Sequence, residues 1–115
     1  MNDQYVLRRQ ADEASARLTR ALVCFSFNVK ESELAAATRS NAKAAFARQI
    51  AMYLSHVAFE LSLSRVAYAF GRDRTTVSHA CHLIEDRRDD PKFDQKLDDL
   101  EQVLREVRAP AGQFG

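Results

Sequence analysis

The segment from Gly71 to His82, with the sequence GRDRTTVSHACH, places residues suited to binding an anion at the start of an expected helix. Arg72 and Arg74 flank Asp73, which can cap that helix, and two threonines follow. Such a helix start offers guanidinium groups, hydroxyls and unpaired backbone N–H groups to a phosphate or a base edge. This chemistry predicts DNA binding. The same spacing also fits a solvated turn followed by an ordinary first helical turn.

The apolar residues around this segment recur at the spacing of two short amphipathic helices. Ser62 is the expected N-cap of the first helix, and Gly71 supplies the left-handed residue that ends it. The residues expected to face the core are Leu63, Val66, Ala67, Phe70, Val77, Ala80, Cys81 and Ile84. Two helices joined by a tight turn form a helix-turn-helix, here over about residues 62–87, whose second helix enters the major groove.

The exposed side of the second helix carries the residues expected to contact DNA. They are Arg74, Thr75, Thr76, Ser78, His79 and His82. Arg pairs bidentately with guanine, and Thr bonds to bases or places its methyl group on that of thymine. Outside this helix, Arg48 and Gln49 begin the exposed side of a longer helix. Arg39 and Lys43 lie in or beside a polar connector, from which a basic arm could reach into a minor groove.

The rest of the chain predicts helices and no β-sheet, so the expected fold class is all-α, a compact helical bundle. Further helices are expected over about 5–25, after a cap at Ser32, over about 43–59 and over about 93–108, with a tail at 109–115. The expected core stripes are Leu7, Ala11, Ala14, Leu18, Ala21, Leu22 and Phe25; Ile50, Ala51, Leu54, Val57, Ala58 and Leu61; and Phe93, Leu97, Leu100, Val103, Leu104 and Val107. The last helix is acidic on its outer side, which we interpret as solvated, or alternatively as a surface for a protein partner. Its acidic residues are Asp94, Asp98, Asp99 and Glu101.

Length and composition indicate one domain, assigned to residues 1–115. Cys24 and Cys81 lie in apolar patterns and are interpreted as buried thiols in a reducing compartment. No apolar run reaches the roughly 20 residues of a membrane span, and no signal peptide opens the chain, so we expect a cytoplasmic protein without a membrane partner. The net charge is only +1, but residues 39–88 carry eight basic and four acidic groups. Positive charge therefore gathers where the helix-turn-helix is expected.

The sequence gives little support for catalysis or metal binding. His79, Cys81 and His82 lie within one helical turn, but Cys81 belongs to the core stripe, and zinc sites usually gather four ligands from two separated pairs. No nucleophile–base set, paired carboxylates or phosphate-binding G-x-x-x-x-G-K-[ST] loop occurs. We therefore expect no enzyme activity, no catalytic residues, no metal and no cofactor.

Several blocks of the chain, in order over roughly residues 18–87, resemble the C-terminal DNA-binding domain of the bacterial replication initiator DnaA. They are Arg48-Gln49-Ile50-Ala51-Met52-Tyr53-Leu54, Ser62-Leu63, Ala69-Phe70-Gly71-Arg72-Asp73-Arg74-Thr75-Thr76-Val77, His79-Ala80-Cys81 and Ile84-Glu85. The resemblance implies a helix-turn-helix of the DnaA C-terminal, Trp-repressor-like type, which recognises short asymmetric boxes in double-stranded DNA.

Carried over by position, the resemblance implies particular roles for individual residues. The base readers would be Asp73, Arg74 and Thr75. The DNA backbone contacts would be Arg48, Gln49, Leu63, Ser64, Thr76 and His79, to which we add the flanking Arg72. The family's minor-groove arginine aligns with Ser40, so Arg39 and Lys43 are the candidates for that role.

Two departures from the family bear on which sequence is read. The family has two glycines before its Arg-Asp pair and this chain has one, Gly71, so the turn is shorter and the second helix is expected to be re-aimed. The family's histidine is Arg74 here, which favours guanine.

We therefore predict sequence-specific double-stranded DNA binding by a transcription regulator or a modulator of replication initiation at DnaA-box-like sites. The alternative is a protein-interaction module that uses the amphipathic N- and C-terminal helices. The chain has no room for an initiator's ATPase module, and we interpret it as a stand-alone relative or an excised domain. Met1 and the additional N-terminal helix favour the stand-alone relative. The oligomeric state is left open.

Overall fold

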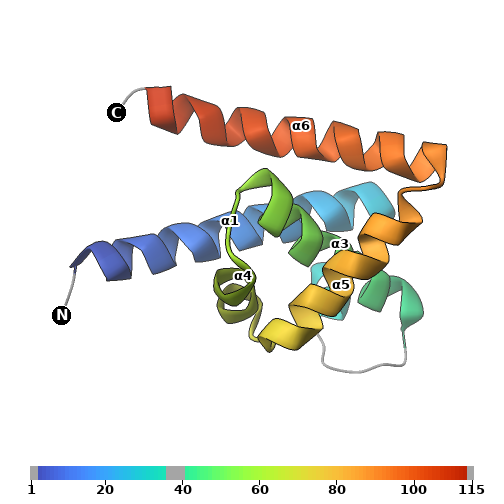
Figure 1. The fold of residues 1–115 in the computed structure, drawn as a ribbon, viewed down its shortest axis with the longest axis horizontal. Coiled ribbons are helices and arrows are strands. Elements are labelled where there is room, and N and C mark those ends of the chain that lie inside the picture. Colours follow the sequence, from blue (N-terminus) through green and yellow to red (C-terminus); the bar gives the residue numbers. More distant parts are fainter. Residues whose placement is uncertain (1–2, 36–40, 114–115) are drawn as a thin grey trace.

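A computed structural model describes residues 3–35 and 41–113, and its regular elements are all helices (Figure 1). In chain order they are α1 (Asp3–Phe27), α2 (Glu31–Ala35), α3 (Ala42–Ala58), α4 (Leu63–Phe70), α5 (Arg74–Arg87) and α6 (Pro91–Gln113). None of the helices in these two ranges combines the length and the apolar character needed to cross a membrane. The expected all-α bundle is confirmed.

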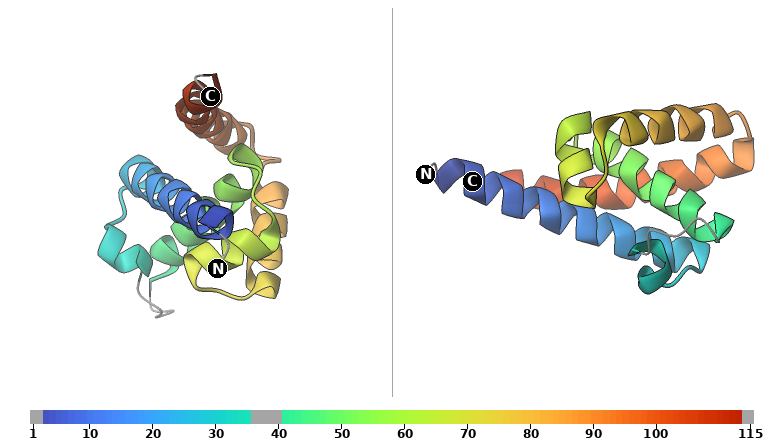
Figure 2. Two further views of the ribbon diagram at one scale, coloured as in Figure 1. Left: turned by 90° about the vertical axis from the view of Figure 1, so that its left-hand side faces the viewer. Right: turned by 90° about the horizontal axis from the view of Figure 1, so that it is seen from below.

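Helix α3 lies at the centre of the bundle and contacts each of the other five helices. Its apolar stripe has the expected position, because Ile50, Ala51, Leu54 and Ala58 are all 0% exposed. Figure 2 shows α1 and α6 running in opposite directions along the length of the molecule, so that α1 begins at the end where α6 finishes. The large core cluster therefore takes residues from the whole chain, from Val23 on α1 to Leu104 on α6.

A second, smaller cluster holds α4 and α5 against α3. Its buried members are Met52, Leu61, Val66, Ala67, Val77 and Ala80, each at most 6% exposed. Leu63, Phe70 and Cys81 are only partly buried at its edge. Because both helices of the pair contribute to one packed cluster, their orientation relative to α3 is fixed by close packing.

The helix ends around the α4–α5 turn are those expected from the sequence. Ser62 caps α4, and its Oγ accepts a hydrogen bond from the backbone N–H of Arg65 at 3.2 Å. Gly71 follows α4 with a φ of 65°, in the left-handed region that glycine adopts without steric cost. Asp73 caps α5. A turn of three residues, 71–73, thus joins the two helices.

The start of α2 differs from the expectation. The helix begins at Glu31, so Ser32 lies inside its first turn and is not the cap. The backbone N–H of Lys30 instead donates to Glu33 Oε1 at 3.1 Å, so the side chain of Glu33 reaches back over the helix start. Glu33 also accepts a hydrogen bond through Oε2 from the side chain of Asn41, which caps α3.

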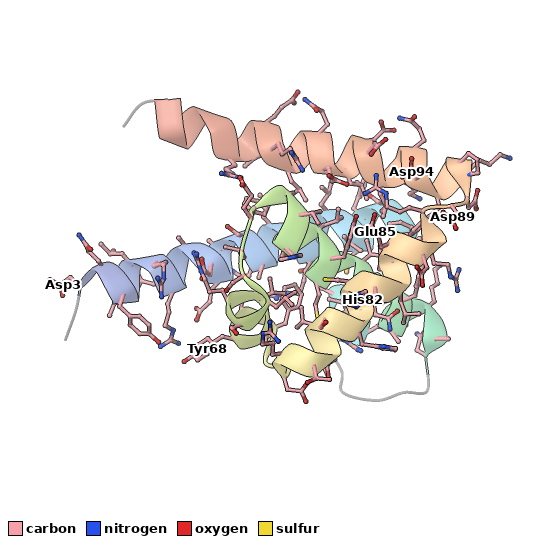
Figure 3. All side chains as sticks on the ribbon, viewed as in Figure 1. Asp3, Tyr68, His82, Glu85, Asp89 and Asp94 are labelled. Carbon is pink, nitrogen blue, oxygen red and sulfur yellow. The ribbon has the colours of Figure 1, made fainter. Side chains whose placement is uncertain are left out.

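Arg88, the residue directly after α5, connects α5 to α6 and α3. Its guanidinium contacts Asp94 and Glu101 at 2.5 Å each, and also Asp98. A hydrogen bond of 3.0 Å from Arg88 Nη1 to the hydroxyl of Tyr53 extends this cluster to α3. Figure 3 labels Asp89 in the connection between α5 and α6 and Asp94 near the start of α6.

These contacts modify the expected solvated acidic face of α6, since Asp94 and Asp98 stay 42% and 55% exposed but Glu101 is only 16% exposed. Three of its four carboxylates turn toward Arg88, because a positive charge that is only 12% exposed requires counter-charges nearby. Two more details of α6 were wrong. Val103 and Val107 are 44% and 52% exposed, outside the stripe of Leu97, Leu100 and Leu104, and the helix continues to Gln113 through most of the expected tail.

Helix α1 packs through a face that the sequence did not indicate. Its buried residues are Asp12, Ala16, Thr19, Val23 and Cys24. The predicted stripe is largely exposed instead: the side chains of Leu7, Leu18 and Phe25 are 63%, 37% and 87% exposed. The alanines at positions 11, 14 and 21 are also exposed. Within the predicted stripe, Leu22 alone packs partly on the core.

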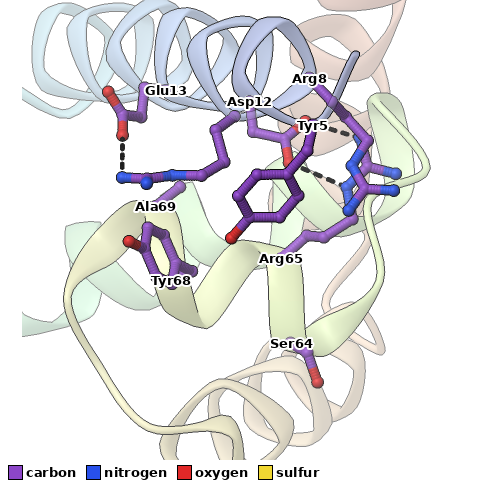
Figure 4. Close-up of a pocket in the computed structure, with 9 residues that line it drawn as sticks. Tyr5, Arg8, Asp12, Glu13, Ser64, Arg65, Tyr68 and Ala69 are labelled. Atoms are coloured by element: carbon purple, nitrogen blue, oxygen red, sulfur yellow. Dashed lines mark hydrogen bonds and ion pairs between the residues drawn. The ribbon is translucent and has the colours of Figure 1, made fainter. Parts of the chain in front are cut away.

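The two polar residues on the buried face of α1 each have a partner. Figure 4 shows Asp12 pointing at Arg65 of α4, and two hydrogen bonds of 2.7 and 2.8 Å join them. Thr19 Oγ1 donates to the carbonyl oxygen of Ser15 at 2.8 Å. Both polar groups are therefore satisfied inside the protein, and their burial does not carry the usual penalty.

Candidate nucleic-acid interface

The first turn of α5 presents its polar residues to solvent. Arg74, Thr75 and Thr76 are exposed, whereas Val77 and Ala80 on the same helix are 0% and 1% exposed. The core therefore holds α5 by one side and leaves its N-terminal turn projecting. This is the arrangement that a helix needs in order to place its first residues against base edges.

Asp73 is exposed at the tip of the turn, and its carboxylate is already used within the protein. Its Oδ1 accepts a hydrogen bond from the backbone N–H of Thr76 at 2.7 Å. Hydrogen bonds from the backbone and then the side chain of Thr76 hold the pKa of Asp73 below its ordinary value. Asp73 is thus an ionised cap that orders the turn carrying Arg74 and Thr75.

Further along α5, His79 is exposed and lies next to the first turn. His82 is also exposed, and its Nδ1 lies 2.9 Å from the carbonyl oxygen of Ser78, so this nitrogen is engaged within the helix. Within the described residues, no group of three or more His, Cys, Asp and Glu side chains is placed to hold a metal ion.

The residues expected at the DNA backbone lie on three neighbouring elements. Leu63 and Ser64 form the start of α4, where Ser64 is exposed and Leu63 is partly packed on the small core cluster. Arg72 lies in the turn, and its backbone N–H donates to the carbonyl oxygen of Ala67 at 2.9 Å. Arg48 and Gln49 are partly exposed near the start of α3. Of these residues, the structure brings Arg48 and Arg72 together beside the α4–α5 turn, whereas Leu63 and Ser64 lie at the opposite end of α4.

Arg48 is held in place by α2. Its Nε donates to the carbonyl oxygen of Leu34 at 2.9 Å. Burial lowers the pKa of Arg48, and the positive charge of Arg72 lowers it further. An arginine of α3 and an arginine of the turn thus lie within electrostatic reach of each other.

The minor-groove candidates are placed only in part. Lys43 is exposed in the first turn of α3. Arg39, together with the aligned Ser40, lies outside the described residues. The minor-groove role therefore stays a prediction for both basic residues.

One arginine near this surface was not predicted from the sequence. Arg20 on α1 lies over the ring of Phe70, with 5.1 Å between its Cζ and the ring centroid. It was overlooked because the wrong face of α1 was assigned to the core. Once Ala16 and Val23 are known to be buried, their spacing of four and three residues from Arg20 places it at the margin of the packed face.

Two helices joined by a three-residue turn, with the first turn of the second helix projecting from the bundle, define a helix-turn-helix protein. The family described as bacterial dnaA protein helix-turn-helix matches residues 19–84, more than half of the chain. The chain therefore belongs to this family.

Two solved structures are similar to the chain over most of its length. One, described as the crystal structure of a DNA replication initiation factor, has a TM-score of 0.75 and 30% identity, and the match covers 89% of this chain and 32% of that chain. The other, the replication initiator DnaA bound to AMPPCP and single-stranded DNA, has a TM-score of 0.76 and 26% identity, with 91% and 32% covered. The chain thus spans about a third of each of these proteins.

Proposed function

We propose that this protein binds double-stranded DNA sequence-specifically by inserting the N-terminal turn of α5 into the major groove. Arg74 and Thr75 read base edges in this mode, while Asp73 orders the turn and reads bases beside them. The observation that carries the proposal is the contrast along α5 between the exposed Arg74–Thr76 and the buried Val77 and Ala80. Membership of the DnaA helix-turn-helix family supports the same mode.

The backbone contacts in this proposal come from residues on both sides of the turn. Leu63 and Ser64 offer the N–H groups at the start of α4, and the remaining contacts come from side chains. These are Arg48, Gln49, Arg72, Thr76 and His79. Lys43 and Arg39 are the candidates for the minor groove. Such contacts fix the register of the protein on the duplex and carry little sequence information themselves.

In the cell we propose that this binding serves transcription regulation or the modulation of replication initiation at DnaA-box-like sites in the cytoplasm. The protein acts here as a DNA-occupying factor without an enzymatic step or a cofactor. Both roles require that the box be distinguished from other duplex DNA, so the sequence preference is the property to measure.

Selection from a random duplex library tests the proposal, because it detects binding and identifies the box in one experiment. The selected duplex should then bind with an affinity that falls steeply as salt rises, since phosphate contacts release counterions. Absence of any duplex binding up to about 1 µM protein in low salt would contradict the proposal, because even non-specific DNA binding commonly reaches this range.

A second function is supported by the apolar residues that α1 leaves on the surface. Leu7 and Phe25 are 63% and 87% exposed on the same side of this helix. In this alternative the protein is an interaction module for a protein partner. Duplex binding is measured for Arg74→Ala and for a Leu7→Ser/Phe25→Ser double variant. If the first variant loses binding and the second binds like the wild type, DNA binding belongs to α5 alone. If the protein binds no DNA, cross-linking in cell extract with wild type and the double variant tests the interaction role directly.

A further inference from the structure

A cleft of about 400 Å³ lies beside the α4–α5 turn, between α1, α2, α3 and the end of α4. Three arginines line it, each from a different element: Arg20 from α1, Arg48 from α3 and Arg72 from the turn. None of the other described residues that line the cleft is acidic. The cleft is therefore a basic site that joins the N-terminal helix to the helix-turn-helix.

Contacts with the surrounding fold position two of the guanidiniums and the backbone of the third arginine. Arg20 lies over the ring of Phe70, and Arg48 is fixed by its hydrogen bond of 2.9 Å to Leu34. Arg72 follows Gly71, and the hydrogen bond from its backbone N–H to Ala67 holds the start of its side chain. Preorganised arginines lose less conformational freedom when they bind an anion than flexible surface side chains do.

Two of the arginines in the cleft, Arg20 and Arg48, are each repelled by a neighbouring positive charge. Burial lowers the pKa of Arg20, and the positive charge of Arg17 lowers it further, against an opposing effect of Glu31. Arg48 is affected in the same way by burial and then by Arg72. Bringing such cations together costs free energy that an anionic ligand recovers.

Besides the charge of Glu31 near Arg20, the end of α4 opposes anion binding, and it is weaker than the arginines. The carboxyl end of α4 lies at the cleft, and a helix end of this kind carries about half a negative charge. The carbonyl oxygens of Ala67 and Tyr68 are capped there by the N–H groups of Gly71 and Arg72. Three full positive charges therefore outweigh the helix end.

The cleft shares Gly71 and Arg72 with the turn that leads into the recognition helix. We propose that it binds a phosphate group of the DNA backbone, with Arg20 of α1 joining Arg48 and Arg72 as the third ligand. This inference rests on the proposed function and adds a residue outside the helix-turn-helix to the DNA contacts. The phosphate belongs to the strand that borders the groove entered by α5, because only one residue, Asp73, separates Arg72 from Arg74.

Substitution of Arg20 tests this role by fluorescence anisotropy with the selected duplex and a scrambled duplex over a series of salt concentrations. Arg20→Ala should weaken both duplexes equally, by about three- to tenfold at low salt, and lower the magnitude of the salt slope by about one. Arg17→Ala is the matched control, because it removes the same charge from the same helix but lies outside the cleft and should leave the salt slope unchanged. Circular dichroism checks that both variants are folded.

The outcomes separate this inference from the proposed function. If Arg20→Ala and Arg17→Ala weaken binding equally, Arg20 acts only through the general field and the inference is overturned, while the proposed function stands. Failure of the wild-type protein to bind any duplex overturns both.

A further arm uses inorganic phosphate without DNA, at ionic strength matched with chloride. If phosphate raises the melting temperature of the wild type but not of Arg20→Ala, and Arg20→Ala leaves duplex affinity unchanged, the cleft is a site for a free anion and not for the DNA backbone. Protection of the wild type by phosphate together with weakened duplex binding by Arg20→Ala supports the inference.

Discussion

Arg65 of α4 and Asp12 of α1 form a bidentate ion pair, although 53 residues separate them in the chain. The guanidinium donates through Nε and Nη2 to the two carboxylate oxygens at 2.8 and 2.7 Å. Asp12 is one of the few charged groups on a buried face, and this pair attaches the first helix of the helix-turn-helix to α1 (Figure 4). The pair therefore contributes to the placement of α4 as well as to stability.

Asp12→Ala should destabilise the fold by about 1–3 kcal/mol, because it leaves Arg65 without its counter-charge in a partly buried position. The upper figures for buried pairs do not apply, since the side chain of Arg65 is 35% exposed. Urea unfolding measures the effect. Glu13→Gln is the control: it breaks a pair to Arg9 at 3.5 Å whose side chains are 41% and 42% exposed, and it should cost less than about 0.5 kcal/mol. Equal losses in the two variants would contradict a special role for Asp12.

Asp73→Asn and Asp73→Ala should differ, because asparagine can still cap α5 and alanine cannot. The pKa of Asp73 is lowered in the folded protein, so its contribution to stability is present above the ordinary pKa of an aspartate, about 4. That contribution is lost as the pH falls through the lowered pKa. The amide proton of Thr76, followed by NMR during an acid titration, should shift in the wild type and stay constant in Asp73→Asn.

If Asp73 also reads a base, Asp73→Asn should change the sequence preference while the melting temperature at neutral pH stays close to that of the wild type. If Asp73→Asn keeps both the helix cap and the DNA sequence preference of the wild type, Asp73 has only a structural role.

Gly71→Ala should cost about 1–2 kcal/mol, since a side chain at a φ of 65° places Cβ too close to the following carbonyl oxygen. No other atom lies within 4 Å of the added Cβ, so the cost is conformational and not a clash with the core. Gly71→Asn should cost less, because asparagine tolerates the left-handed region better. The denaturant midpoints of the wild type, Gly71→Ala and Gly71→Asn, compared at equal m-values, rank their stabilities. A Gly71→Ala variant as stable as the wild type would contradict this prediction.

Arg74→His places the residue of the wider family at this position and should change the preferred box. Loss of a bidentate contact with guanine costs about 1–3 kcal/mol of discrimination at one base pair. Repeating the library selection with the variant identifies that base pair. Arg48→Ala is the comparison, and it should weaken all duplexes alike because a phosphate contact carries no sequence information. A selective loss in Arg48→Ala would contradict its proposed backbone role.

Arg88→Ala should destabilise the fold by about 2–3 kcal/mol, because three carboxylates and Tyr53 lose their common partner. The figure is moderate because Asp94 and Asp98 are 42% and 55% exposed and water can solvate them in the variant. Arg87→Ala removes the neighbouring arginine, which lies over the ring of Phe46, and should cost at most about 1 kcal/mol. Thermal unfolding compares the two variants, and a similar loss for both would show that the cluster around Arg88 contributes little.

The sequence was informative where structure depends on neighbours in the chain. Ser62, Gly71 and Asp73 act over three residues or through their own backbone, and all three were placed correctly. The stripe of α3 was also predictable, since a central helix must bury its most apolar side. These local rules account for the helix-turn-helix and for the placement of its exposed turn.

The wrong assignment of the buried face of α1 arose because a polar residue is buried by a distant partner. Asp12 and Thr19 made the packed face of α1 resemble a solvated face, and its exposed alanines and leucines resembled a core stripe. The partner of Asp12 lies on another helix, and periodicity within α1 contains no information about it. The carboxylates of α6 were misassigned for the same reason, because their partner Arg88 belongs to the end of α5.

Along α5, the residues that pack on the core are different from those proposed to contact DNA, and this separation affects how the recognised sequence can change. Val77 and Ala80 secure the helix in the core, whereas Arg74 and Thr75 have exposed side chains. Substitutions at exposed positions of this kind usually change stability by no more than about 0.5 kcal/mol. Substitutions at Arg74 and Thr75 can therefore change the recognised sequence while the packing of α5 on the core stays intact.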